Sequence, residues 1–135
     1  MKFKLALMSL TFFICSYLNG QNWIYIGKSS DGSSYYMRST SVSNSYTKKV
    51  WVKHSSSKLT VKKNGKTYTY VNAYEVLLYE FSCTNNQIKL HSVVTYNSKG
   101  TVVDSYNPPD YYLEWKDVVP DSVGEMLLEK ACELF

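Results

Sequence analysis

The N-terminal segment, residues 1–20, has the pattern of an export signal, and it limits how much chain is left to fold. Lys2 and Lys4 make a basic start, and the fourteen residues from Leu5 to Leu18 carry no charge, as in the apolar region of a secretory signal. A spanning helix needs about 20 apolar residues, so retention as a membrane anchor is the less favoured alternative. Cleavage near Gly20 leaves residues 21–135, which is enough for a single domain.

The cysteines indicate a disulfide in the exported chain. Cys15 lies inside the predicted signal, and the bulky Ile14 before it argues against lipidation. Removal of the signal leaves Cys83 and Cys132, and two thiols in an oxidising compartment usually form a bond. A redox pair would need closer spacing, of the C-x-x-C kind. We therefore predict a structural disulfide that closes a loop of 49 residues, for which the chain-entropy relation gives about 4 kcal/mol of stabilisation.

Short segments with strand composition recur along the exported chain. Residues 55–66 are rich in Ser and Lys and contain Asn64–Gly65, a dipeptide that suits a type I′ turn, so we expect an exposed hairpin or loop there. The segment 70–83 is apolar on both faces, as a central strand would be. Alternation and β-branched or aromatic content predict an antiparallel meander, with strands at 22–27, 33–39, 47–55, 70–83, 88–96 and 101–106.

The end of the chain changes from strand to helix periodicity. Pro108 and Pro109 cannot donate to a strand ladder. Ser122 and Glu125 have the spacing of a capping box, and apolar residues then recur at helical intervals, with glutamates on another face. The predicted class is α+β, an antiparallel sheet packed with one C-terminal helix, and Cys132 of the helix would bond Cys83 of the sheet.

Candidate catalytic or metal-binding residues are few. His54 and His91 are isolated in predicted strands, without the base and orienting group that a nucleophile needs or the ligand spacing of a zinc site. Glu75 and Glu80 are the carboxylates that a hydrolase cleft would use, and both also fit a solvated strand position. No Gly-rich phosphate loop follows a strand. We therefore expect a protein that is not an enzyme and that has no cofactor or metal.

Charge is distributed unevenly along the exported chain. Residues 21–74 hold nine Lys and Arg and a single acid, Asp31, whereas residues 75–135 hold four lysines and ten acids. Such asymmetry predicts a basic surface for a polyanion or an acidic protein. The competing interpretation is that neighbouring strands pair these charges and cancel the field. The candidate binding residues combine lysines with aromatic side chains: Lys48, Lys49, Trp51, Lys53, Lys62, Lys63, Lys66, Tyr68 and Tyr70.

Several of these segments, taken in order, resemble one known family. They are NWIYIG at 22–27, YYMRSTSV at 35–42, VWVK at 50–53, YEFSC at 79–83, IKLHSVVTYNSKGTVV at 88–103 and WKDVVPDSVGEMLLEKAC at 115–132. The chain is similar here to the surface-adhesin protein E family of bacterial exported proteins. The resemblance implies a sheet of about six strands, a C-terminal helix, a Cys83–Cys132 bond and a tendency to dimerise. It also implies attachment to host extracellular-matrix or serum proteins.

These observations lead to two functional hypotheses. In the first, the protein is an exported binding module at the bacterial surface or in the periplasm, and the basic, aromatic stretch from Trp51 to Tyr70 contacts acidic macromolecules or polyanionic glycans. In the second, it is an envelope protein that acts through homodimerisation or docking on an assembly. Nucleic acid is not expected as a partner, because exported proteins rarely meet it.

Overall fold

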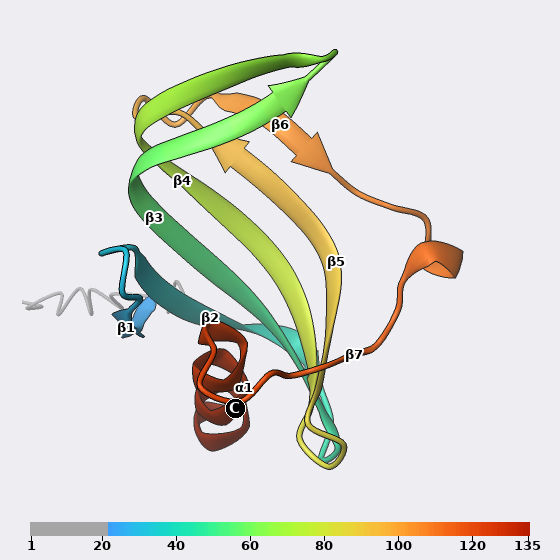
Figure 1. Ribbon diagram of the computed structural model, residues 1–135. Coiled ribbons are helices and arrows are strands. Elements are labelled where there is room, and N and C mark those ends of the chain that lie inside the picture. The colour runs from blue at the N-terminus through green and yellow to red at the C-terminus, as the bar shows by residue number, and fades with distance from the viewer. Residues whose placement is uncertain (1–21) are drawn as a thin grey trace, which may run out of the picture.

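The computed structural model describes residues 22–135, and the predicted export signal lies outside the described residues. Seven strands form one antiparallel sheet, in which six follow one another in chain order from β1 to β6. The seventh, β7, pairs with β5 beyond the end of β6. A single helix, α1, packs against one face of this strongly twisted sheet (Figure 1). The predicted α+β meander with a C-terminal helix is therefore confirmed.

The strand and helix bounds follow the local sequence pattern, except that the strand predicted at 47–55 continues to Lys63 and the one predicted at 70–83 begins at Lys66. The predicted helix is α1, Val123–Leu134, and the short 3-10 helix η1, Asp110–Tyr112, follows the two prolines. The sheet has one strand more than the six or so that we expected. The additional strand, β7, was not predicted because it is only two residues long and shows no periodicity. The strands are β1 Ile24–Lys28, β2 Ser34–Ser43, β3 Thr47–Lys63, β4 Lys66–Ser82, β5 Gln87–Tyr96, β6 Val102–Tyr106 and β7 Lys116–Asp117.

The segment at 55–66 is a hairpin rather than a loop. β3 and β4 continue as a ladder up to the pair Lys63 and Lys66. Asn64 and Gly65 have φ values of 50° and 73°, as a type I′ turn requires at both central positions. Thr, Val and Tyr favour an extended backbone and hold the ladder even where the segment is exposed.

The long β3–β4 hairpin bends near its middle, at Asn72. This residue has φ 52°, a left-handed conformation that Asn adopts more readily than most residues. The ladder pairs step from Ser56 with Ala73 to Lys58 with Val71, so the bend falls between them. Beyond it the hairpin turns over the face of the sheet that α1 also covers (Figure 1). We call residues 57–71 the hairpin tip.

The core lies between α1 and the lower half of the sheet. Val50 and Val52 of β3 and Phe81 of β4 are fully buried against Leu127 and Ala131 of the helix. At the start of the helix the Glu125 N–H donates to Ser122 Oγ at 3.2 Å, and the Asp121 N–H donates to the Glu125 carboxylate at 2.7 Å. The predicted cap is thus present, with Asp121 taking the place of the Ser122 N–H as the second donor.

The predicted disulfide is also present. Cys83, directly after β4, is bonded to Cys132 of α1, and their Cα atoms lie 5.9 Å apart. The bond joins the bottom of the central hairpin to the last turns of the helix. The bond therefore fixes α1 to the sheet.

Candidate binding surface

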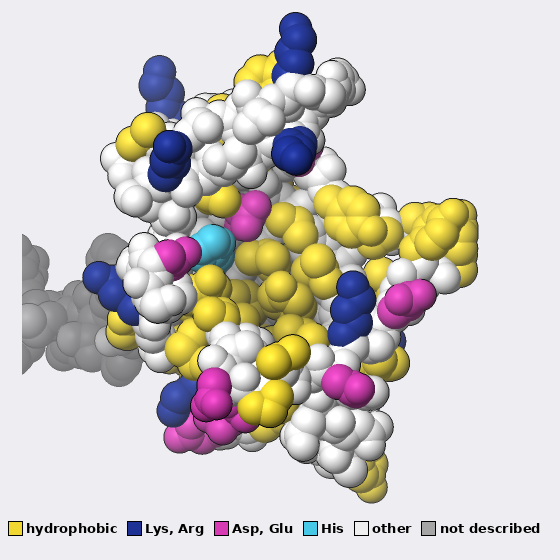
Figure 2. Space-filling view, in the orientation of Figure 1, with side chains coloured by type: hydrophobic (Ala, Val, Ile, Leu, Met, Phe, Trp, Pro, Cys, Tyr) yellow, Lys and Arg dark blue, Asp and Glu magenta, His cyan; other side chains and the backbone are white. Residues whose placement is uncertain are grey.

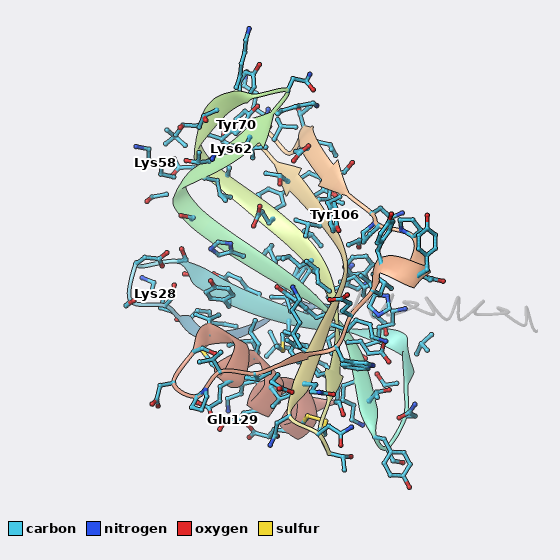
Figure 3. All side chains as sticks on the ribbon, turned by 45° about the vertical axis from the view of Figure 1, so that its right-hand side comes forward. Lys28, Lys58, Lys62, Tyr70, Tyr106 and Glu129 are labelled. Atoms are coloured by element: carbon cyan, nitrogen blue, oxygen red, sulfur yellow. A yellow bond between two sulfur atoms is a disulfide. The ribbon has the colours of Figure 1, made fainter. Side chains whose placement is uncertain are left out.

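The hairpin tip carries a group of exposed lysines. Lys58 and Lys62 come from β3, Lys66 from β4, and Lys63 borders the turn between the strands. All four are solvent-exposed. Figure 2 shows basic side chains projecting around this end of the molecule, and Figure 3 places Lys58, Lys62 and Tyr70 on it. The bend at Asn72 thus separates a compact cationic lobe from the rest of the domain.

These lysines form no ion pair with an acid among the described residues. Across the ladder Lys58 faces Val71, Lys62 faces Thr67, and Lys63 faces Lys66. Within residues 22–135 the ion pairs are His54–Glu75, Lys89–Glu80, His91–Glu80 and Lys130–Glu133. None of them includes a Lys or Arg from the acid-poor first half. Pairing between neighbouring strands therefore does not cancel the basic charge in the part of the chain that the structure describes.

The structure divides the candidate binding residues into two groups. Lys62, Lys63, Lys66, Tyr68 and Tyr70 lie together on the hairpin tip, where Tyr68 is 43% exposed. Lys48, Lys49, Trp51 and Lys53 lie on β3 below the bend. Tyr70 lies opposite Leu59, six residues along β3 from Lys53, so the two groups are about 20 Å or more apart along the strand, at about 3.3 Å per residue.

The lower group has contacts of its own. Lys48 Nζ donates to the Phe135 backbone oxygen at 3.0 Å. Trp51 is half-buried and lies on the face opposite Val50 and Val52. Lys53 lies over the ring of Tyr36, with Nζ 4.8 Å from the ring centre. These side chains therefore contact the sheet and the helix and not the tip.

Beneath the tip the sheet is hollowed, and the hollow is lined by Lys62 and Glu75, which the sequence singled out, and by residues that it did not. Val61 of the tip is only 9% exposed, and a cavity of about 300 Å³ lies between it and Glu75, Val93, Asp104 and Tyr106. Tyr106 also borders a neighbouring cavity of about 320 Å³ beside Tyr79 and Leu90. Figure 2 shows exposed hydrophobic side chains in this hollow. Alternation in the sequence predicts which side chains of β5 and β6 point to the same face as α1. The bend in the hairpin is what places the tip over these side chains.

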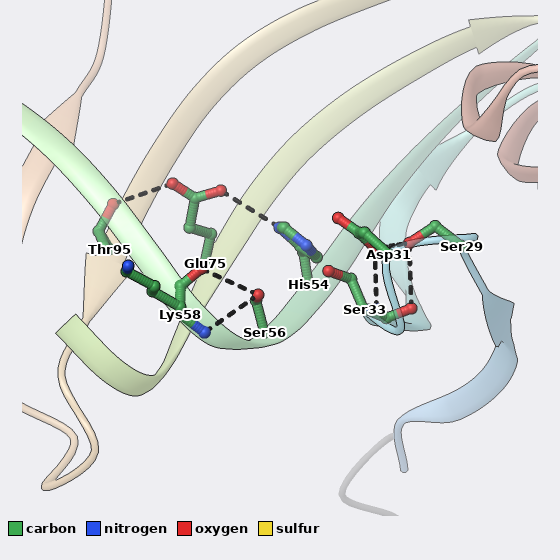
Figure 4. A network of polar contacts seen from close by, with 8 residues as sticks. All are labelled: Ser29, Asp31, Ser33, His54, Ser56, Lys58, Glu75 and Thr95. Atoms are coloured by element: carbon green, nitrogen blue, oxygen red, sulfur yellow. Dashed lines mark hydrogen bonds and ion pairs between the residues drawn. The ribbon is translucent and has the colours of Figure 1, made fainter. Parts of the chain in front are cut away.

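A polar network crosses the inner face beside the hollow (Figure 4). His54 Nδ1 and Glu75 Oε2 lie 3.4 Å apart, and Thr95 donates to the other Glu75 oxygen at 3.3 Å. Ser33 Oγ and His54 Nε2 are both buried and have no hydrogen-bond partner among the described residues. A nucleophile has to be activated by hydrogen bonding and has to reach a substrate. In the described residues Ser33 Oγ makes no hydrogen bond to the His54 ring.

Two carboxyl groups have lowered pKa values: that of Asp31, beside this network, and that of Glu80, on the opposite face of the sheet. The pKa of Asp31 is lowered to about 2, because the Ser29 hydroxyl and the Ser33 N–H both donate to it. Burial alone would raise the pKa of Glu80, but the hydrogen bond with His91 at 2.9 Å and the charge of Lys89 lower it below its usual range. Both arrangements stabilise the charged carboxylate within the folded domain.

Glu75 and Glu80, the carboxylates considered for hydrolysis, lie on opposite faces of β4. They are five residues apart in an unbroken ladder with β3, in which Glu75 faces His54 and Glu80 faces Lys49. Side chains an odd number of residues apart point to opposite sides of a strand. The two glutamates therefore cannot flank one glycosidic bond.

The described part of the chain also lacks groupings that would indicate other site types. Among residues 22–135, no three His, Cys, Asp or Glu side chains are gathered as metal ligands. No helix in that range is long and apolar enough to cross a membrane.

The structure is a disulfide-linked sheet that presents a basic hairpin without ion pairs among the described residues. In the comparison with known families, residues 23–133 match the family described as surface-adhesin protein E. The chain belongs to this family of exported surface adhesins. No curated protein and no solved structure matches the chain.

Proposed function

We propose that this protein is a non-enzymatic binding module of the bacterial surface that attaches through its hairpin tip to polyanionic macromolecules. Host matrix or serum proteins and polyanionic glycans are the expected partners. The observation that carries the proposal is the group of exposed lysines at the tip, none of them in an ion pair within the described residues. Family membership supports an adhesive role.

The physical chemistry of the tip favours broad attraction over recognition of one phosphate geometry. Lysine is a solvated point charge on a flexible stem, unlike the planar fork of arginine. Several such charges on one lobe raise the local potential and attract polyanions at long range. Tyr68 and Tyr70 add amphipathic area of the kind enriched in interfaces. We therefore expect salt-sensitive binding with low selectivity among acidic partners.

The experiment is charge reversal at the tip. Wild-type protein should bind a heparin surface at low salt and be released well before about 1 M, where the Debye length falls to about 3 Å. The triple variant Lys62→Glu, Lys63→Glu and Lys66→Glu should be released at clearly lower salt than wild type. The matched control reverses Lys28, Lys116 and Lys130, which lie outside the tip and change the net charge equally. Undiminished binding of the tip variant, or equal loss in the control, contradicts the proposal.

The outer strands favour a second candidate function, self-association in the envelope. Within the described residues β1 and β6 each pair on one side only. Their exposed edges carry Tyr25 and Tyr106, each 56% exposed, and an open edge is a template for pairing with another strand. This alternative predicts a salt-insensitive dimer in sedimentation and no affinity for heparin.

A further inference from the structure

The face of the sheet opposite α1 holds a second group of aromatic side chains. A depression of about 460 Å³ is lined by Trp23, Lys53, Ser55, Tyr74, Val76 and Tyr96. Lys53, Tyr74 and Val76 alternate along their strands with residues that face α1 or the hollow, so they project from the other side. The volume is in the range of small-molecule sites, about 300 to 1,000 Å³. The site lies below the bend, away from the hairpin tip.

Lys53 lines this depression, Arg38 lies next to it against the Trp23 ring, and neither has a carboxylate partner among the described residues. The Arg38 guanidinium carbon is 4.8 Å from the centre of the Trp23 ring, and Lys53 Nζ is 5.1 Å from the same ring. Neither residue takes part in an ion pair within residues 22–135. Contact with an aromatic face holds a cation in place but leaves its charge in excess. This positive charge therefore favours binding of an anionic group in the depression.

The other wall of the depression is a flat aromatic surface. Tyr74 and Tyr96 are direct cross-strand neighbours, and their rings are stacked with centroids 4.9 Å apart and an interplanar angle of 10°. Ser55, opposite Tyr74 on the neighbouring strand, adds a hydroxyl that can donate or accept. Aromatic planes, a hydroxyl and the Lys53 ammonium therefore line one site, and Arg38 lies against its Trp23 wall.

We propose that this depression binds an acidic saccharide. The C–H face of a pyranose ring is apolar and packs against aromatic planes, while its hydroxyl groups need donors and acceptors at the rim. A uronic acid adds a carboxylate, for which Lys53 provides the charge. A neutral sugar would use the aromatic planes but not the cation. This inference goes beyond the proposed function, because it uses none of the residues of the tip.

The test is calorimetric titration with a hyaluronan tetrasaccharide, which alternates glucuronate with N-acetylglucosamine, and with the neutral N-acetylglucosamine tetramer. The acidic ligand should bind more tightly than the neutral one. Trp23→Ala should weaken its binding by about tenfold through loss of the stacking surface. Lys53→Gln, a milder surface change, should reduce the affinity for the acidic ligand to that for the neutral one.

A second pair of residues gives a matched control. Lys89 Nζ lies 4.2 Å from the centre of the Trp115 ring, so Trp115→Ala and Lys89→Gln remove the same side-chain types elsewhere and should leave the affinity unchanged. The tip triple variant should also bind the tetrasaccharide as wild type does, whether or not the tip binds heparin. The inference is overturned if neither tetramer binds, if both bind equally, or if the Trp23 and Lys53 variants bind like wild type. Loss of binding in the tip variant would overturn it too.

Discussion

Cys132 in α1 is bonded to Cys83 at the end of the central strand β4, across 49 residues of sequence. All of β5, β6 and β7 lie within the loop that the bond closes. The bond therefore holds together the second half of the sheet and the helix that covers it.

Removal of this disulfide should destabilise the domain substantially. The chain-entropy relation gives about 4 kcal/mol for a loop of this length, which is a large part of the stability of a small domain. We expect reductant to lower the midpoint of chemical denaturation of wild type. The Cys83→Ser, Cys132→Ser variant should start at that lower midpoint and not respond to reductant. Equal midpoints with and without reductant in wild type would contradict this.

Phe81 should be a principal contributor to core stability. It is fully buried between β4 and α1, and truncation of a buried Phe to Ala costs about 3 to 5 kcal/mol through lost burial and the cavity left behind. Phe81→Ala should therefore lower the unfolding free energy by this amount in urea titration. Tyr46→Ala removes an aromatic ring that is 71% exposed and should change stability by less than about 0.5 kcal/mol.

The bend in the hairpin depends on the conformation of Asn72. Its φ of 52° is unstrained for Gly and costs a β-branched residue about 1 to 2 kcal/mol. Asn72→Gly should therefore keep wild-type stability within about 1 kcal/mol, whereas Asn72→Val should be destabilised by about 1 to 2 kcal/mol. Thermal unfolding of the two variants provides the comparison. Equal stability would show that the bend does not need this backbone conformation.

The acid side of the stability profile should depend on Asp31 and Glu80. Both carboxyls have pKa values below their usual 3.8 and 4.5, that of Asp31 at about 2. A carboxyl with a depressed folded-state pKa stabilises the protein above its unfolded pKa, and this contribution is lost as the pH falls through the folded-state value. Unfolding free energy should therefore decrease from about pH 4.5 towards pH 2.

Amide substitutions test this pH dependence. Asp31→Asn and Glu80→Gln should each make the decrease shallower in denaturant titrations at several pH values, because the group that takes up the proton is gone. Glu114→Gln, at an exposed position outside the ion pairs of residues 22–135, should keep the wild-type profile. A profile that is the same in all four proteins would contradict the assignment.

The prediction of strands and helix succeeded where the pattern is local. The segments 88–96 and 101–106 coincide closely with β5 and β6, because period-two alternation and a tight turn are read from adjacent residues. Ser122 caps α1 as its spacing with Glu125 indicates. The two-residue β7 could not be predicted, since it pairs only because the chain passes β5 on its way to α1.

In the candidate sites, too, some features are visible in the sequence and others depend on the fold. The acid-poor composition of residues 32–74 is visible in the sequence, but the separation of its lysines into a tip group and a sheet group depends on the bend at Asn72. Glu75, Asp104 and Tyr106 approach the tip only through that bend. The same holds for Trp23, which meets Tyr74 and Tyr96 across a depression made by several strands.

Apart from η1 and β7, the sequence by itself determined the elements, their antiparallel order, the bond between Cys83 and Cys132 and the sign of the charge on each half of the chain. These properties depend on residue type and on spacing within a few positions, or on there being two cysteines to pair. The tertiary structure alone decided which lysines stay unpaired, where the sheet is hollow and which aromatic rings face one another. Those outcomes depend on the twist of the sheet and on one left-handed residue in β4, which bring distant residues together.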